Sequence, residues 1–465
     1  LWELNAGSPD GQTADGSANE YALRSFFGRL TYDYDNRYLV EANIRRDGTS
    51  RIFKDSRWGV FPSFSGAWRI INEPFMEGTR NVLSDLKLRG GWGVLGNQAI
   101  SYYSYQSVLD QANYSFGGTV VQGVAPVDGA NRDLIWETTE TLNFGLDMGF
   151  LGNQYTLSIE GYRKLTYDIL MKLPVSTLYG LNAPYQNAGK VKNTGLEITA
   201  GYKLNTHGWN FQVSANAAYN KNEVMDLKNG GARIWSGKYF NQEGYAINSI
   251  GGYIAEGLFK TEEEVANSAT IPGTDTAPGD IKYRDINNDG KIDGEDRVYI
   301  GNTMPKWTFG LNLFAEWKGL DATFLFQGAA DVQGYLAGPG VVGEMIGAKG
   351  KPSYMYRDCW DAETNPNGKF PRAFSSYRQN NSIYNPSSFW IVNSSYLRLK
   401  NFQLGYTLPK EWCNMMGISR IRVYYSGQNL LTFTKFDKGF DPESPEGGSS
   451  YPQVKTNTFG LNITF

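Results

Sequence analysis

Residues 455–465 alternate apolar and polar side chains with a period of two. Phe459, Leu461, Ile463 and Phe465 form the apolar set, and the residues between them are Gly, Asn and Thr. A strand with one apolar and one polar face suits a site with lipid on one side and water on the other. An ordinary half-buried strand of a soluble sheet shows the same alternation, so this segment alone leaves both interpretations open.

The same alternation recurs along most of the chain. Its longest run is residues 209–220, and similar runs fall at 26–34, 38–44, 142–148, 196–202 and 307–317. We count about thirteen strands of about ten residues, the length that tilted strands need to cross a bilayer. Strands of soluble sandwiches usually have only about five or six residues. The pattern therefore predicts an all-β fold, namely a transmembrane antiparallel β-barrel.

Aromatic residues end several of these apolar faces. Trp209 and Tyr219 end one predicted strand, and Trp307 and Trp317 end another. Large rings at such positions suit the two interfaces between membrane and water, although a soluble core would also accept them as large hydrophobes. The last residue, Phe465, gives an aromatic carboxy-terminus, which resembles the assembly signal of bacterial outer-membrane barrels. These features favour the outer membrane of a bacterial cell as the location.

The lengths of the connections give an independent indication of orientation. Outer-membrane barrels place short turns in the periplasm and long loops outside the cell. Short connections fall near residues 35, 152, 206 and 319, with intermediate ones at 72–84 and 408–418. Long loops fall at 46–57, 96–135, 171–188, 222–303, 332–390 and 433–454. If the last strand ends in the periplasm, every long loop is extracellular.

The two cysteines fall at opposite ends of the strands by this argument. Cys359 is in a long loop and Cys413 is in a short connection. About 25 Å or more of membrane should therefore separate them. We expect no disulfide between them, although the cell surface and the periplasm are oxidising enough to permit one.

Composition narrows the function classes. The mean hydropathy is −0.44, and the sequence contains no run of about 18 apolar residues that could form a spanning helix. The net charge of −3 gives no reason to expect a nucleic-acid partner. His207 is the only histidine, which removes most zinc sites and most acid–base or triad chemistry, and no catalytic signature is present. We therefore expect a membrane protein that is not an enzyme.

The most specific chemical motif is the segment DINNDGKIDGED at 285–296. Its spacing matches an EF-hand-type calcium loop of about twelve residues, in which Gly290 permits the sharp turn. The expected ligands of Ca²⁺, or of Mg²⁺ in its place, are Asp285, Asn287, Asp289, Lys291, Asp293 and Asp296. Asp296 stands where Glu is usual, which favours a weaker or less selective site. Acidic turns are also often merely solvated, and we expect a stiffening clip rather than a catalytic centre.

Several separate segments resemble one known family, in the order that the family has them. They are YLVEANIRRDGTSRI at 38–52, WGVFPSFSGAWRI at 58–70, DLKLRGGWGVLGNQ at 85–98, NRDLIWETTETLNFGLD at 131–147, PGDIKYRDINNDGKIDGEDRVYIGN at 278–302 and SYLRLKNFQLGYTLP at 395–409. Nearly the whole chain resembles the carboxy-terminal half of a SusC/RagA-type TonB-dependent transporter of Bacteroidetes.

The resemblance implies a barrel of about 22 strands, filled by an amino-terminal plug. It also implies a SusD-like surface lipoprotein as a lid, import of oligosaccharides or peptides, and energy from TonB–ExbB–ExbD delivered through the plug. It allows a dimer of the transporter–lipoprotein pair. Residues 1–465 would then be the carboxy-terminal part of the barrel, with the plug and roughly the first nine strands expected before them. The odd strand count agrees, because closed single-chain barrels of bacteria have even counts.

Contacts with the imported molecule are expected from aromatic residues of the long loops, because sugar rings and peptide side chains both pack on such rings. The candidates are Tyr102, Tyr103 and Tyr105; Trp235, Tyr239 and Phe240; and Tyr354, Tyr356 and Trp360. Loops of this length must also pack on one another, so each ring has a structural alternative. Charged residues that face the lumen are expected to contact the plug or water: Glu160, Asp147, Glu197, Arg45 and Glu41.

Two alternatives to active import stay open from the residues alone. A passive porin would share the strand pattern but would have no plug. A soluble, calcium-clipped, β-rich protein for glycan binding or adhesion would need the apolar faces of the strands to pack on one another.

Overall fold

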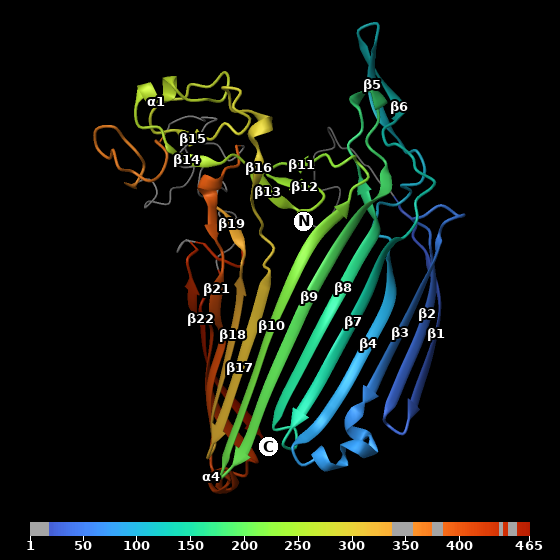
Figure 1. Cartoon of the computed structure of the whole chain (residues 1–465), viewed down its shortest axis with the longest axis vertical. Helices are drawn as coiled ribbons and strands as arrows, with labels where there is room; N and C mark the ends of the chain where they lie inside the picture. The colour runs from blue at the N-terminus through green and yellow to red at the C-terminus, as the bar shows by residue number, and fades with distance from the viewer. Residues whose placement is uncertain (1–17, 337–356, 374–384, 437–439, 445–452) are drawn as a thin grey trace, which may run out of the picture.

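The computed structural model describes residues 18–336, 357–373, 385–436, 440–444 and 453–465. Its main element is a 13-stranded antiparallel sheet in which each strand pairs with the next one of the sheet along the chain (Figure 1). The strands are β1 Leu23–Tyr34, β2 Tyr38–Thr49, β3 Trp58–Arg69, β4 Leu83–Asn97, β7 Glu137–Phe150, β8 Tyr155–Lys172, β9 Tyr185–Thr206, β10 Trp209–Asp226, β17 Trp307–Trp317, β18 Leu320–Ala330, β21 Tyr396–Thr407, β22 Arg420–Thr434 and β23 Thr456–Thr464. The predicted number and positions of the strands are confirmed.

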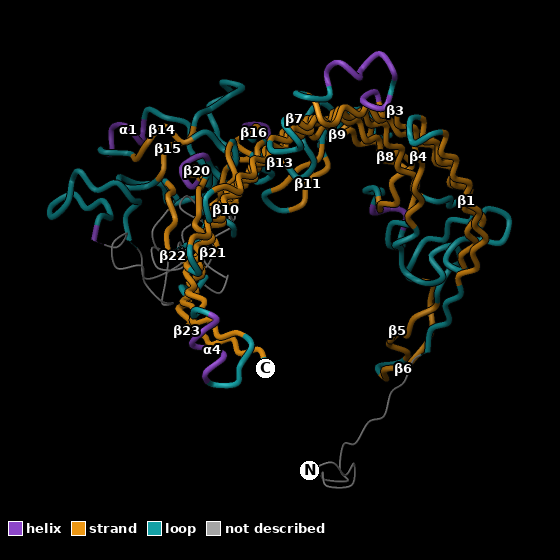
Figure 2. Tube along the Cα trace, turned by 90° about the horizontal axis from the view of Figure 1, so that it is seen from below, coloured by secondary structure: helices purple, strands orange, loops and turns teal. Residues whose placement is uncertain are grey.

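The sheet is bent into an arch whose two edges are β1 and β23 (Figure 2). Within the described residues these two strands do not pair with each other, so the arch is an open part of a barrel wall. Its concave side corresponds to the lumen. None of the helices in the described part of the chain is long and apolar enough to span a membrane.

The convex face of the arch carries the apolar residues of the period-two pattern. Leu30 lies opposite Ala42 in the β1–β2 pair, and Leu30 is 71% exposed. Phe459 of β23 is 83% exposed. A monomeric soluble protein rarely exposes a continuous apolar surface of this extent, whereas lipid covers it at no cost. The soluble alternative is therefore wrong, because it required these faces to pack on one another.

Aromatic pairs end the apolar face of the β10–β17 pair. Trp209 lies opposite Trp317 with ring centres 5.3 Å apart, and Tyr219 lies opposite Trp307 at 5.0 Å. The four predicted girdle residues thus form two pairs, one near each end of the strands. This is the arrangement that interfacial aromatic belts require.

One end of the sheet has the short and intermediate connections. The β9–β10 turn, His207–Gly208, and the β17–β18 turn, Lys318–Gly319, have positive φ at both residues, as type I′ hairpin turns require. The longer connections at this end contain the short helices η2 Ile70–Asn72, η3 Pro74–Thr79 and α4 Lys410–Met415. This end is periplasmic in barrels of this kind, as predicted from the connection lengths.

The other, extracellular end carries folded structure that the sequence pattern did not predict. A hairpin, β5 Leu109–Phe116 with β6 Thr119–Pro126, projects from the loop after β4 (Figure 1). The remaining extracellular elements are β11 Ile234–Ser236, β12 Tyr239–Asn241, β13 Ser249–Gly252, β14 Ala255–Leu258, β15 Ile281–Tyr283, β16 Val298–Gly301, β19 Gln333–Tyr335, β20 Ile391–Asn393, α1 Glu262–Ala266, η4 Thr177–Tyr179, η5 Gly294–Asp296 and η7 Ser388–Trp390. They form small sheets in the order β11-β12-β13-β16, β14-β15 and β19-β20.

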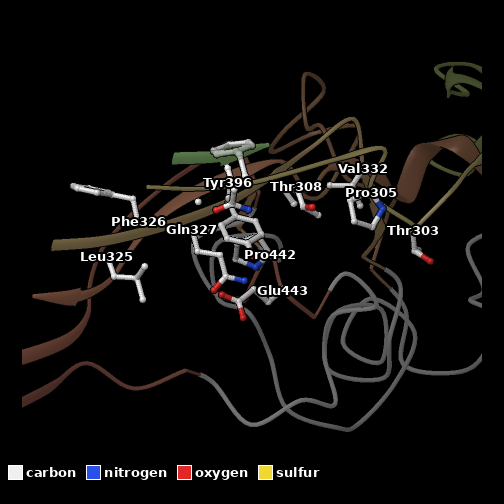
Figure 3. A pocket seen from close by; sticks show the side chains of 15 residues that line it. Thr303, Pro305, Thr308, Leu325, Phe326, Gln327, Val332, Tyr396, Pro442 and Glu443 are labelled. Atoms are coloured by element: carbon white, nitrogen blue, oxygen red, sulfur yellow. The ribbon is translucent and has the colours of Figure 1, made fainter. Parts of the chain in front are cut away.

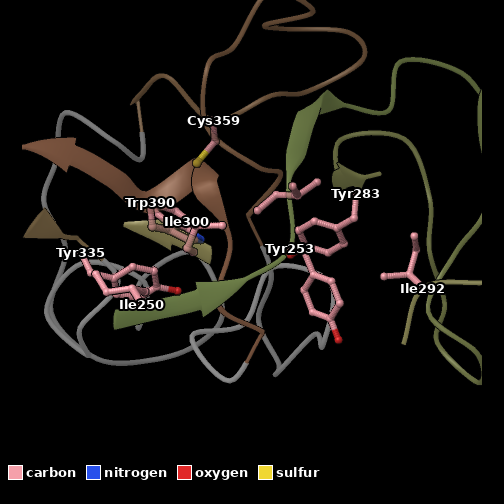
Figure 4. Close-up of a cluster of buried hydrophobic side chains, with 9 residues drawn as sticks. Ile250, Tyr253, Tyr283, Ile292, Ile300, Tyr335, Cys359 and Trp390 are labelled. Carbon is pink, nitrogen blue, oxygen red and sulfur yellow. The ribbon is translucent and has the colours of Figure 1, made fainter. Parts of the chain in front are cut away.

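These loops have a hydrophobic core of their own, shown in Figure 4. Its buried members come from two long connections, between β10 and β17 and between β18 and β21, and are Ile250, Tyr253, Ile281, Tyr283, Ile292, Ile300, Tyr335, Cys359 and Trp390. Burial raises the pKa of the Cys359 thiol to about 11. Cys413 lies in α4 at the opposite end of the strands, so the predicted separation of the two cysteines is confirmed.

Candidate functional site

A pocket of about 590 Å³ opens beside the upper inner wall of the barrel (Figure 3). Its wall is formed by β10, β17 and β18, and its polar lining includes Asn216, Thr303, Thr308, Gln327 and Tyr396. Thr308 follows the girdle residue Trp307, so the pocket lies close to the extracellular rim. We call this cavity the inner-wall pocket.

The strand register explains why a hollow forms here. Gly310 lies between Asn216 of β10 and Gln327 of β18, and all three positions face the lumen. A Cβ atom at position 310 would lie 2.6 Å from the Asn216 Oδ1 atom, so only glycine leaves room for the amide. The missing side chain opens a space between two amide groups.

The polar lining groups are available for hydrogen bonding. Within the described residues, no hydrogen bond occupies the side chains of Asn216, Thr308 or Gln327. Amide groups offer both donors and acceptors, and threonine hydroxyls do the same. The pocket can therefore bind molecules rich in hydroxyl or amide groups, such as sugars and peptides.

A buried ion network holds residues 441–443, the segment that lines the pocket together with the barrel wall. Arg398 of β21 contacts Asp441 at 2.7 Å and Glu443 at 2.6 Å, and its Nε donates to Thr432 at 3.0 Å. Lys400 adds a second cation to Glu443 at 3.2 Å. The Arg398 side chain is almost fully buried. Asp441 depends on it for charge compensation, whereas Glu443 also has Lys400. The network fixes residues 441–443, of which Pro442 and Glu443 line the pocket.

Charged groups elsewhere on the inner wall pair with one another. Arg89 pairs with Asp147 at 3.2 Å and with Glu160 at 2.5 Å, while Lys87 also contacts Asp147 at 2.9 Å. Glu41 is paired with Arg29, and Arg45 is paired with Asp47. Ion pairs within the wall thus engage four of the five lumen-facing charges named from the sequence, all except Glu197.

The acidic 285–296 loop forms a tight turn outside the barrel. The Asp285 carboxylate accepts hydrogen bonds from the backbone N–H of Asp289 at 3.3 Å and of Gly290 at 2.8 Å. Gly290 has φ +84°, which confirms why glycine is needed there. Asn287 also accepts from the Asp289 N–H, at 3.1 Å. The first half of the loop therefore has the turn that the motif predicts.

The second half of the loop is engaged in internal contacts. Asp296 is fully buried, and its two carboxylate oxygens accept from the N–H groups of Ile286 and Asp293, each at 2.8 Å. The Lys291 ammonium contacts Asp293 at 2.6 Å, and this hydrogen bond lowers the pKa of the Asp293 carboxyl. Among the described residues, no three Asp, Glu, His or Cys side chains converge as a metal group. The oxygen-rich donor set nevertheless suits a hard cation chemically.

The aromatic candidates divide into exposed and buried rings. Tyr102 is 38% exposed and lies under the Arg51 guanidinium at 4.6 Å, and Trp235 is 37% exposed. Phe240 and Trp360 are buried, which gives both a packing role. Three further candidates, Tyr103, Tyr105 and Tyr239, are partly buried. The Tyr103 hydroxyl accepts a hydrogen bond from the Glu20 N–H, and the Tyr105 ring packs on Phe53. Tyr239 lies in β12. Tyr354 and Tyr356 lie outside the described residues.

Sequence reasoning missed the inner-wall pocket and the Arg398 network. Asn216 and Gln327 occur in the polar half of the period-two pattern, where every second residue is polar. The one available signal was Gly310, a small residue in the middle of a long strand, which often marks close approach or free space. The partners of Arg398 come from a loop far along the chain, so spacing could not reveal them.

An open wall of bilayer-length strands, apolar outside and polar inside, defines an outer-membrane β-barrel protein. Comparison with known families gives the particular class. The family described as "TonB dependent receptor-like, beta-barrel" matches residues 3–430, and the chain belongs to this family. This is a family of transporters and not of enzymes, and the chain is an outer-membrane protein.

Individual relatives agree with this assignment. "TonB-dependent receptor SusC" of Bacteroides thetaiotaomicron is 32% identical over 98% of this chain and 44% of its own length. "TonB-dependent receptor P3" of Formosa agariphila is 31% identical over 96% of this chain and 46% of its own length. The RagAB peptide importer in its "closed-closed" state matches with a TM-score of 0.81 and 28% identity, covering 100% of this chain and 50% of that chain. The chain spans about half the length of the relatives it matches.

The ion network yields a test of how the inner-wall pocket is held. Replacing Arg398 by Leu leaves Asp441 without a cation and leaves Glu443 with Lys400 alone, which should lower local stability by about 3–5 kcal/mol. Hydrogen exchange should therefore become faster at the amides of Glu443 and Ser444, which both bond to Asp441. The control is Arg420→Leu, an exposed arginine at the periplasmic end of β22. Unchanged exchange in Arg398→Leu would show that the network does not hold this segment.

Proposed function

We propose that the complete protein imports nutrients across the outer membrane as the barrel subunit of a SusC-like transporter. The observation that carries this proposal is the inner-wall pocket, whose uncommitted amide and hydroxyl groups lie near the extracellular entrance of a SusC-like wall. A molecule entering from outside would meet these groups before it reached the ion pairs of Arg89 near the middle of β4. The cargo is an oligosaccharide or a peptide, since both carry groups that donate and accept hydrogen bonds.

We further propose that a SusD-like surface lipoprotein covers the entrance and that TonB–ExbB–ExbD supplies the energy. Similarity to SusC and to the RagAB structures supports both parts of the proposal. A dimer of the transporter–lipoprotein pair belongs to the same proposal. Phe465 at the end of β23 remains a predicted assembly signal.

An uptake assay tests the import function and the pocket together. Cargo that purifies with the complete protein is first identified by mass spectrometry and then supplied to cells at a concentration below saturation. The double variant Asn216→Ala with Gln327→Ala removes two hydrogen-bonding groups worth about 0.5–1.5 kcal/mol each, so uptake should fall by about tenfold.

Asn312→Ala is the matched control, because Asn312 also faces the lumen of β17 but lies outside the pocket. Its uptake should equal that of the natural protein. Removal of TonB should abolish uptake in every case. Uptake that persists without TonB would indicate a passive porin, and equal uptake by the double variant would exclude the pocket from the pathway.

We also propose that Ca²⁺, or Mg²⁺ in its place, binds the 285–296 loop and clips the extracellular structure. The proposal is supported by the loop spacing and by Ile292, a buried member of the extracellular core that lies between the acidic residues. The ligands would be oxygens of Asp285, Asn287, Asp289, Asp293 and Asp296 with the Lys291 carbonyl, and the Lys291 ammonium would have to leave Asp293.

Thermal unfolding with and without metal tests this clip. Calcium at about 100 times its dissociation constant should stabilise the protein by about 2.7 kcal/mol relative to a chelator. The variant Asp285→Ala with Asp289→Ala should lose this calcium-dependent difference. Glu295→Ala, which removes a neighbouring acid outside the ligand set, should keep it. Identical unfolding of the natural protein in calcium and in chelator would refute the site.

A further inference from the structure

We propose that Arg233 and Arg297, together with Trp235, bind a carboxylate group of the imported molecule at the barrel entrance. We call these three residues the arginine ledge. The inference rests on the proposed import function and adds a chemical class to its cargo.

Both guanidinium groups of the arginine ledge are gathered around one indole ring. The Arg297 guanidinium lies 3.9 Å from the centre of the Trp235 ring, and that of Arg233 lies 5.9 Å from it. Backbone contacts hold the two side chains: Arg233 donates to the Arg297 carbonyl at 2.6 Å, and Arg297 donates to the Gly237 carbonyl at 3.0 Å. The two cations are therefore positioned before any ligand arrives.

Neither cation of the ledge has a negatively charged partner among the described residues. The Arg297 Nε is buried and makes no hydrogen bond. Arg233 Nε donates only to the neutral Gln242, at 2.8 Å. Several other partly buried arginines of this protein are paired with carboxylates, namely Arg89, Arg372, Arg398 and Arg422. Arg51, Arg57 and Arg69, like Arg297, have a buried Nε without a hydrogen bond. The ledge differs from them because it places two unpaired guanidinium groups around one ring.

An unpaired cation of this kind is energetically costly. Burial lowers the pKa of Arg297, and the like charge of Arg233 lowers it further. The neighbouring Asp296 accepts hydrogen bonds from the backbone N–H groups of Ile286 and Asp293 and makes none with Arg297. An anion bound between the two guanidinium groups would remove this cost, since it would satisfy free N–H donors and offset the repulsion.

The ledge faces the route into the barrel. Trp235 is in β11, which lies on the concave side of the arch when the molecule is seen from below (Figure 2). The preceding residue, Ile234, packs against Val224 and Leu227 at the extracellular end of β10, which anchors β11 to the rim. Successive residues of a strand point to opposite faces, so Trp235 points away from this anchor.

The geometry selects a carboxylate as the ligand group. Guanidinium groups bind carboxylates through two parallel hydrogen bonds, and the exposed part of the Trp235 ring can pack on the adjoining apolar atoms. The carboxylate can belong to the carboxy-terminus of a peptide or to a uronic acid sugar. Both sources offer the same planar anion beside an apolar surface.

Paired probes that differ only in charge test the arginine ledge in the complete, purified transporter. One pair is N-acetyl-tetraalanine and its carboxy-terminal amide, and the other is trigalacturonic acid and its methyl ester. The natural protein should bind at least one carboxylate probe about tenfold more tightly than its neutral partner, and raised salt should weaken this preference. Calorimetric titration measures each dissociation constant.

The double variant Arg233→Gln with Arg297→Gln should lose the preference and keep its affinity for the neutral probe. The control Lys410→Gln with Arg420→Gln, which removes two exposed positive charges at the periplasmic end, should retain the preference. Arg233→Gln alone leaves the Arg297 bond to Gly237 intact and should lose part of the preference. This single variant keeps the test valid if the double variant fails to fold.

Equal affinities for charged and neutral probes, or a preference that survives in the double variant, would overturn the inference. If the double variant keeps the preference and no longer binds the partner lipoprotein, the ledge is a protein interface and not a carboxylate site. Uptake of cargo without any carboxylate preference would refute the ledge alone. Failure of uptake with the preference intact would refute the import function and leave the ledge as a binding site.

Discussion

The whole structure depends on one constraint: inside a bilayer, backbone N–H and C=O groups have no water to bond with. Every strand must therefore pair along its full membrane-crossing length with a neighbour on each side, and every lipid-facing side chain must be apolar. The 13-stranded sheet satisfies this condition for all strands except its two edges, β1 and β23. The same constraint sets the strand length, the period-two pattern and the aromatic pairs that end the Trp209–Tyr219 strand.

This constraint does not apply to side chains on the lumen side or to loops beyond the extracellular rim, so both can vary more widely. On the inner wall a glycine at position 310 can replace a side chain, because the backbone ladder continues without it. Outside the rim, long loops are solvated and must pack on themselves, which produces the core around Tyr335 and Trp390. The inner-wall pocket and the arginine ledge both lie in these less constrained regions, as expected for groups that serve function rather than insertion.

The sequence predicted the barrel wall well, because alternation, turns and girdle residues are local signals. The strand positions and the short turns such as His207–Gly208 all follow from neighbours within about ten residues. The candidate site was predicted poorly, because it depends on contacts between distant segments. Trp235 was named from its ring alone, while its partner Arg297 lies more than sixty residues away along the chain. Asn216 and Gln327 are more than a hundred residues apart. The small extracellular sheets other than the β5–β6 hairpin were missed for a related reason, since their strands have only three or four residues and carry little pattern.

Spin-label scanning along β17 tests the central claim, that one face of this wall meets lipid and the other meets water. Single cysteines at Leu311, Asn312 and Leu313 would be labelled in the complete protein after Cys359 and Cys413 are replaced by Ala, and the protein would be reconstituted into vesicles. Labels at 311 and 313 should be accessible to oxygen dissolved in lipid, and the label at 312 should be accessible to a water-soluble nickel complex. Equal accessibility at all three positions, or the reverse alternation, would contradict the barrel wall described for this chain.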